Sequence, residues 1–176
     1  MGRNTTAQSV GQAAGSCAGF TLIELLIVIV ILGISAAIAV PMMSSAASMQ
    51  IRAAAGIVAA DLEYAKSLAI TTGQRHKVVF NVGNDSYEIR KVVDAVDEAV
   101  KHPITKKSQY VVNFATDGRL DRVEIDSTTF TGDAVTFDPL GSPVGLLAEG
   151  VVTLHAGDFT RTVTVEPVTG FISVSE

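Results

Sequence analysis

The sequence FTLIELLIVIVILGISAAIAV, which runs from Phe20 to Val40, decides the fold of this chain. Only one of its 21 residues, Glu24, is charged. A helix of this length covers about 31 Å at about 1.5 Å per residue, which is enough to cross the hydrocarbon core of a bilayer. We therefore predict that residues 20–40 form a membrane-spanning helix.

Glu24 is the unusual residue of this segment. A carboxylate inside an apolar membrane helix costs about 2.5–3.5 kcal/mol on insertion scales and usually marks a functional position. Gly19 directly precedes the apolar run, and cleavage between Gly19 and Phe20 would create an α-amino group four residues from Glu24. The sequence thus predicts an acid and a cationic terminus at the same membrane depth.

The order of residues around Gly19 is similar to the signature of the type IV pilin and pseudopilin superfamily. In that signature a polar, basic leader ends in Gly and is followed by Phe-Thr-Leu-Ile-Glu and a long apolar helix. The resemblance implies that a prepilin peptidase removes the leader, residues 1–19, and that Phe20 becomes N-methylated. It also implies that Glu24 sets the register of a helical filament by pairing with the N-terminus of a neighbouring subunit.

Two alternative interpretations of the N-terminal region fit it less well. Cys17 follows small residues as in a lipidation site, but here the apolar region comes after the cysteine. Ala37-Ile38-Ala39 could end an ordinary secretory signal, although Glu24 would interrupt its apolar part. Arg3, the only charged side chain before Glu24, favours a cytoplasmic leader and a body on the opposite side of the membrane.

Beyond the apolar segment, residues 41–73 are predicted to form an amphipathic helix. Pro41 removes a helical hydrogen bond and should kink the helix, and it also matches a common pilin proline. Apolar residues recur at helical spacing at Ile51, Ala55, Val58, Leu62, Ala65 and Ala69. Arg52, Asp61, Glu63 and Lys66 are assigned to the opposite, solvated side, and Gly73 is expected to end the helix.

The pattern then changes to that of strands, so residues 74–176 are predicted to form a β-rich globular domain. Lys77–Val82 and Ser86–Val92 flank Gly83-Asn84-Asp85 as in a hairpin. Further strands are predicted at Tyr110–Phe114, Leu120–Ile125, Ala134–Phe137, Val151–His155, Arg161–Val165 and Phe171–Val174. The expected fold class is α+β and pilin-like, with one long N-terminal helix packed on an antiparallel β-sheet.

This layout resembles the GspH/FimT branch of minor pseudopilins, with supporting segments at 62–70, 137–143 and 163–172. The resemblance implies a structural subunit of the periplasmic pseudopilus of a type II secretion system, anchored in the inner membrane with its C-terminal domain in the periplasm. Its partners would be other pilin-like subunits, the prepilin peptidase and the inner-membrane assembly platform. A FimT-like minor type IV pilin in pilus assembly or DNA uptake is the alternative.

Nucleic-acid binding and catalysis find little support in the sequence. The net charge is −5, and Arg161 is the only Lys or Arg after Arg122, whereas DNA binding requires a basic patch. His76, His102 and His155 lack the paired spacing of zinc ligands and are expected to be surface or half-buried strand residues. The acids of residues 93–109 lack calcium-loop spacing, so that segment is predicted to be a solvated loop or short surface helix, open to a partner. We expect no enzymatic activity, no metal and no cofactor.

Overall fold

The computed structural model describes residues 20–94 and 96–175, and the side chains of residues 37–45 lie outside that description. Gly19 and the rest of the predicted leader therefore fall outside the described residues. The chain divides into two compact units, residues 1–39 and 40–176. The helix α1, Leu22–Thr72, begins in the first unit and ends in the second.

The N-terminus of α1 is capped by Thr21. The backbone N–H of Glu24 donates to Thr21 Oγ1 at 3.2 Å, and that of Leu25 donates to the Thr21 carbonyl oxygen at 3.2 Å. Threonine is a favoured N-cap because its hydroxyl satisfies a backbone N–H that the first turn leaves without a partner. The helix therefore starts at Leu22, the third residue after the predicted cleavage between Gly19 and Phe20.

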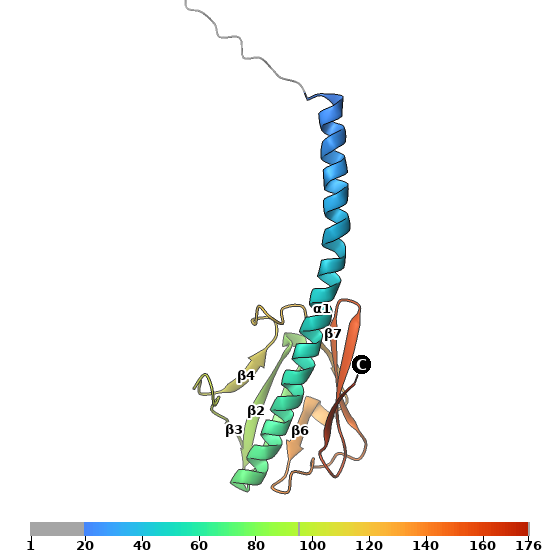
Figure 1. Cartoon of the computed structure of the whole chain (residues 1–176). Coiled ribbons are helices and arrows are strands. Elements are labelled where there is room, and N and C mark those ends of the chain that lie inside the picture. The colour runs from blue at the N-terminus through green and yellow to red at the C-terminus, as the bar shows by residue number, and fades with distance from the viewer. Residues whose placement is uncertain (1–19, 95, 176) are drawn as a thin grey trace, which may run out of the picture. The chain divides into compact units, whose positions relative to one another are not determined.

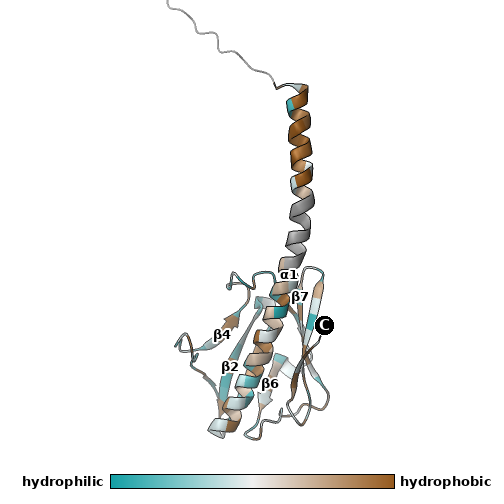
Figure 2. Ribbon diagram, viewed as in Figure 1, coloured by the Kyte–Doolittle hydropathy of each residue, from teal (hydrophilic) through white to brown (hydrophobic). Residues whose placement is uncertain are grey.

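The first unit exposes apolar side chains around the helix. Large apolar residues from Leu22 to Ile34 are exposed by between 42% and 82%, and Figure 2 shows this part of α1 as hydrophobic around its visible surface. Within the described part of the chain, we find no helix whose length and apolar character together suffice to cross a membrane. The side chains of residues 37–45 are not described. The membrane span predicted for residues 20–40 and the kink predicted at Pro41 therefore stay predictions.

The second half of α1 presents one apolar stripe to the domain. All six residues predicted from the helical spacing are buried: Ile51, Ala55, Val58, Leu62, Ala65 and Ala69. Gly73 has a φ of +66°, a left-handed conformation that glycine adopts without strain and that ends the helix as predicted. The stripe is rich in alanine, which allows the strands to approach the helix backbone closely.

The larger of two antiparallel sheets is built around a hairpin. β1, Arg75–Asn81, and β2, Ser86–Val93, pair through the 3₁₀ turn Val82–Asn84 and confirm the predicted hairpin. On its other side β1 pairs with β6, Ala134–Phe137, which follows the short 3₁₀ helix Thr131–Asp133. The outer side of β2 is shared by β4, Tyr110–Asn113, and β3, Val96–Ala99, each of which pairs with half of it.

The second sheet has four strands in the order β5-β7-β8-β9. Its strands are β5, Glu124–Thr128, β7, Gly150–Ala156, β8, Phe159–Val165, and β9, Ile172–Ser175. In Figure 1 the second half of α1 lies across the strands of the domain, with β2, β3 and β4 on one side and β7 on the other. The predicted α+β fold is confirmed, and the sheet is split in two.

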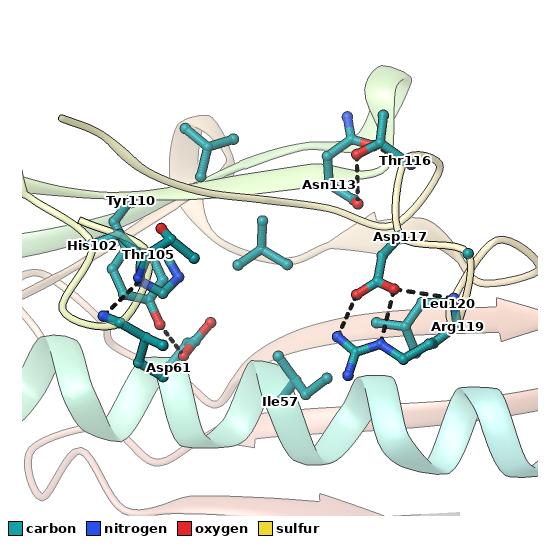
Figure 3. A pocket seen from close by; sticks show the side chains of 14 residues that line it. Ile57, Asp61, His102, Thr105, Tyr110, Asn113, Thr116, Asp117, Arg119 and Leu120 are labelled. Carbon is teal, nitrogen blue, oxygen red and sulfur yellow. Dashed lines mark hydrogen bonds and ion pairs between the residues drawn. The ribbon is translucent and has the colours of Figure 1, made fainter. Parts of the chain in front are cut away.

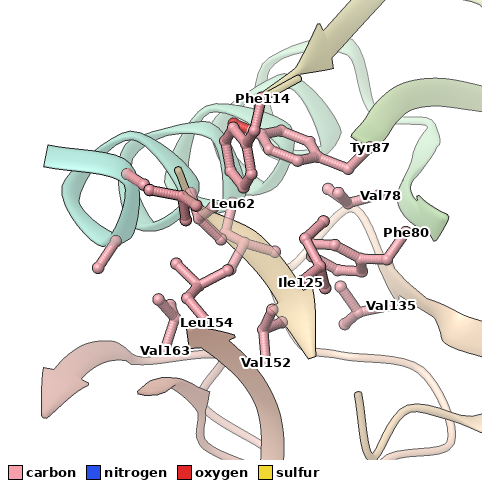
Figure 4. Packing of buried hydrophobic residues seen from close by; sticks show 14 of the residues in the cluster. Leu62, Val78, Phe80, Tyr87, Phe114, Ile125, Val135, Val152, Leu154 and Val163 are labelled. Atoms are coloured by element: carbon pink, nitrogen blue, oxygen red, sulfur yellow. The ribbon is translucent and has the colours of Figure 1, made fainter. Parts of the chain in front are cut away.

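One hydrophobic core joins the helix and both sheets. Figure 4 shows Leu62 of α1 among side chains from the two sheets, including Phe80 and Tyr87 from the first and Leu154 and Val163 from the second. Phe80 stacks on Phe130 with ring centroids 5.9 Å apart. Because both sheets bury their inner faces against the same helix, the domain forms around one apolar centre.

Two predictions of secondary structure are wrong. The strand predicted at Leu120–Ile125 begins only at Glu124. The backbone N–H of Leu120 donates to the Asp117 carbonyl, and that of Val123 donates to the Leu120 carbonyl, so residues 117–123 form two successive turns. These turns bury Leu120 and Val123, which are three residues apart. Residues 93–109 were expected to be a loop or a helix, yet they contain β3. Ion pairs between β3 and its neighbours, such as Lys91 with Glu98 at 3.8 Å, favour this charged strand.

Candidate functional site

The first candidate site is the N-terminal end of α1. Phe20 is 73% exposed, and Glu24 is exposed in the first helical turn. Unpaired backbone N–H groups and the helix macrodipole favour a negative charge in this turn. Among the described residues Glu24 has no ion-pair partner. Because α1 begins at Leu22, the α-amino group of a cleaved Phe20 would lie just before the helix, four residues from Glu24. An acid and an amine would then lie at the same end of the helix.

The second candidate site surrounds a buried carboxylate in the domain. Asp61 of α1 is only 8% exposed. The hydroxyl of Tyr87 donates to Oδ2 at 2.6 Å, and that of Tyr110 donates to Oδ1 at 2.7 Å. Burial raises the pKa of Asp61, and the two hydrogen bonds oppose that rise. Burial likewise raises the pKa of Tyr87 and of Tyr110. The cluster ties the helix to β2 and β4.

The ring of His102 extends this cluster toward the surface. It stacks on Tyr110 with ring centroids 4.4 Å apart and an interplanar angle of 4°. Its Nδ1 accepts hydrogen bonds from the backbone N–H groups of Ile104, at 3.2 Å, and Thr105, at 3.3 Å. His102 therefore holds the loop that precedes β4 against Tyr110. The expectation that it is a strand residue is wrong.

A cavity of about 620 Å³ opens beside this cluster. Figure 3 shows Ile57 and Asp61 of α1 below it, Tyr110 and His102 at one end, and Asp117 with Arg119 at the other. Arg119 binds the carboxylate of Asp117 through two nitrogen atoms, at 2.8 and 3.0 Å, and these bonds lower the pKa of Asp117 to about 2. A second cavity, of about 460 Å³, borders the same strand β4 on the side of Lys107.

Asp61 was missed as a special position because the sequence reasoning assigned it to the solvated side of the helix. It follows Val58 by three residues and precedes Ala65 by four, so it lies on the edge of the apolar stripe. That spacing could have indicated burial. The hydrogen-bond donors of the buried Asp61 carboxylate are the hydroxyls of two tyrosines that lie far away in the sequence. No local sequence pattern indicates that these tyrosines pair with Asp61.

The remaining titratable groups offer little chemistry. Among the described residues, no group of three or more His, Cys, Asp or Glu side chains could hold a metal ion. His76 is 3% exposed in β1, so the expectation that it is at most half-buried is wrong, and burial lowers its pKa. His155 of β7 is exposed, as expected. Both oxygens of Asp61 are engaged by tyrosines, which makes its role structural.

Comparisons with known proteins match both parts of the chain. A model of the prokaryotic N-terminal methylation motif matches residues 15–40, and a model of the type II transport protein GspH matches residues 54–169. No protein of curated function matches the sequence.

Two solved structures are similar in fold. The minor pseudopilin EpsH from the type 2 secretion system of Vibrio cholerae has a TM-score of 0.54 at 13% identity, covering 70% of this chain and 94% of EpsH. The type IV minor pilin FimU of Pseudomonas aeruginosa has a TM-score of 0.50 at 17% identity, covering 71% of this chain and 92% of FimU. At these identities the likeness concerns the fold alone.

Proposed function

The chain belongs to the GspH family of type II transport proteins, and on that premise we propose that it is a minor pseudopilin, a structural subunit of a periplasmic pseudopilus involved in protein secretion. The observation that carries this proposal is the order of the two matches. A methylation motif on an exposed apolar helix precedes a GspH domain. In this role the helix joins a shared filament core and the domain lies on the filament surface.

The proposal assigns a function to each part of the chain. Residues 1–19 are the leader that a prepilin peptidase removes, residues 20–40 span the inner membrane before assembly and then line the filament core, and residues 41–73 connect this segment to the periplasmic domain, residues 74–176. Pro41 loosens the helix between anchor and domain. Cleavage after Gly19 frees Phe20 for N-methylation.

Glu24 sets the axial register of the subunit in this proposal. A carboxylate inside an apolar filament core is costly without a partner, because the charge is removed from water. The amine of a neighbouring Phe20 supplies that partner. A subunit shifted along the filament would leave both charges unpaired, so a single axial position is favoured. The inner-membrane assembly platform and its cytoplasmic motor provide the energy of assembly.

Deletion of the coding sequence from the host chromosome tests this function. A minor pseudopilin is required for export, so folded secreted proteins should accumulate in the periplasm and return to the medium when the wild-type chain is supplied again. Normal secretion in the deletion strain would contradict the proposal.

A minor type IV pilin is the second candidate, favoured by the similarity in fold to FimU. Counting surface pili on the same deletion strain separates the two functions. Loss of pili together with unchanged secretion would support the pilin. DNA uptake is less consistent with the chain, because the described domain lacks a run of basic residues beyond Arg122.

A further inference from the structure

Among the described residues, the strand β4 has no partner strand along one of its two backbone edges. It pairs with β2 on one side only, through Tyr110–Asn113. The backbone N–H of Phe114 donates to the carbonyl of Asp85 at 2.9 Å, which continues the same ladder. Because hydrogen-bonded positions alternate along an antiparallel strand, Tyr110 and Val112 face β2 with their backbone groups. Val111 and Asn113 direct theirs outward, and the outward carbonyl of Asn113 accepts a hydrogen bond from Thr116 Oγ1 at 3.3 Å.

In the part of the domain that the structure describes, the other strand edges are covered or charged, with one exception. The edge of β6 is covered by Pro143 and Val144, whose N–H donates to the carbonyl of Thr136 at 2.7 Å. The edge of β3 carries Asp97 and Glu98, and charged side chains discourage strand pairing. On β5 the backbone N–H of Ile125 donates to Asp85 Oδ1 at 2.8 Å. The exception is β9, whose four residues are uncharged.

The edge of β4 borders two cavities. The cavity of about 620 Å³ lies on the helix side, where Ile57, Ile104 and Leu120 contribute apolar surface between the polar groups at its two ends. The cavity of about 460 Å³ lies on the opposite side and is lined by Lys107 and polar residues. Val111 and Asn113 border both. A strand added here would direct alternate side chains into the two cavities, which is how strand addition selects its ligand.

The charges around this edge indicate what kind of strand fits. Residues 100–109 contain Lys101, Lys106 and Lys107 and no acid. The three lysines are exposed and make no ion pair with any residue that the structure describes. We propose that the edge of β4 binds an extended segment of another protein by strand addition, with its apolar side chains on the helix side and its acidic side chains on the lysine side.

A single substitution can block this edge without breaking the sheet. Val111→Pro removes an N–H that points outward, and proline is tolerated on an edge strand when its missing N–H faces solvent. Val174→Pro in β9 is the matched control. The N–H of Glu166 donates to the carbonyl of Phe171 at 2.9 Å, so alternation also directs the N–H of Val174 outward. The two valines are 46% and 44% exposed.

The test uses the full chain in detergent micelles and a fluorescent peptide that alternates valine and aspartate. We expect binding that weakens as salt rises, a loss of affinity of at least about tenfold for Val111→Pro, and no change for Val174→Pro. A peptide with N-methylated valines should not bind, because it lacks the backbone donors. Equal binding by Val111→Pro, by the N-methylated peptide or by an alternating valine and lysine peptide would overturn the proposal, as would absence of binding to the unaltered chain.

Discussion

Replacing Asp61 by alanine should remove much of the stability of the domain. The change leaves two tyrosine hydroxyls without an acceptor, and their residues, Tyr87 and Tyr110, are only 1% and 7% exposed. An unsatisfied buried hydroxyl costs about 1–3 kcal/mol, so the loss of an acceptor for two of them should lower the free energy of unfolding by about 2–6 kcal/mol. That is a large part of the roughly 5–15 kcal/mol that stabilises a typical domain.

Urea unfolding followed by far-ultraviolet circular dichroism can measure this loss in every variant, and near-ultraviolet circular dichroism adds a local probe in the variants that keep all their tyrosines. The chain has three tyrosines and no tryptophan, and the ring centroids of Tyr64 and Tyr110 are 5.7 Å apart. The tyrosine signal therefore reports on the surroundings of Asp61. The full chain in detergent micelles is the appropriate sample.

A triple variant provides the decisive comparison. Adding Tyr87→Phe and Tyr110→Phe to Asp61→Ala removes the hydroxyls that had lost their acceptor, so at least half of the lost stability should return. A loss of less than about 1 kcal/mol for Asp61→Ala, or no recovery in the triple variant, would refute the idea that this carboxylate satisfies both tyrosines.

Four further predictions address the remaining sites. Burial raises the pKa of Asp61 in the folded chain, so ionisation of this carboxyl group destabilises the domain as pH rises above about 4. Asparagine does not ionise. In urea unfolding, the free energy of unfolding of Asp61→Asn should therefore improve relative to that of the unaltered chain between acid and neutral pH. Gly170 has a φ of +60°, and an added Cβ would lie 2.5 Å from the carbonyl oxygen of Gly141. Gly170→Ala should therefore lower the free energy of unfolding by about 2–3 kcal/mol. The control Gly118→Ala should leave it unchanged, because a Cβ at Gly118 meets no atom within 4 Å. Gly19→Arg should keep the leader attached, and a mature mass starting at Phe20 would contradict that cleavage site. Glu24→Val should preserve membrane insertion and leader removal while lowering incorporation into filaments, measured by crosslinking in the host, and normal incorporation would argue against its role in setting the register.

The long helix and most strands could be predicted from local patterns. The stripe from Ile51 to Ala69 has the spacing of a helix face, and Gly73 has the residue type that a helix end requires. The hairpin of β1 and β2 was likewise visible as two alternating runs around a turn. Each of these features depends on residues that are close together in the sequence.

The parts that escaped prediction depend on distant partners. β3 has a charged sequence of low strand propensity, and it is favoured because Lys91 on the adjacent β2 and Lys77 on β1 supply opposite charges. Asp61 is satisfied by tyrosines 26 and 49 residues further along the chain. The division into two sheets, too, is decided by which strand edges meet in space, and alternation within a strand carries no such information.

The ion pair and the hydrogen bond of Lys66 bear on the order in which parts of the chain come together during synthesis. Its Nζ binds Glu63 at 2.8 Å and donates to the carbonyl oxygen of Gly170, 104 residues further along the chain, at 2.9 Å. β9 begins directly after this point. The contact between Lys66 and Gly170 can therefore form only after Gly170 has left the ribosome. If residues 20–40 are the proposed membrane helix, they reach the insertion machinery before this contact closes.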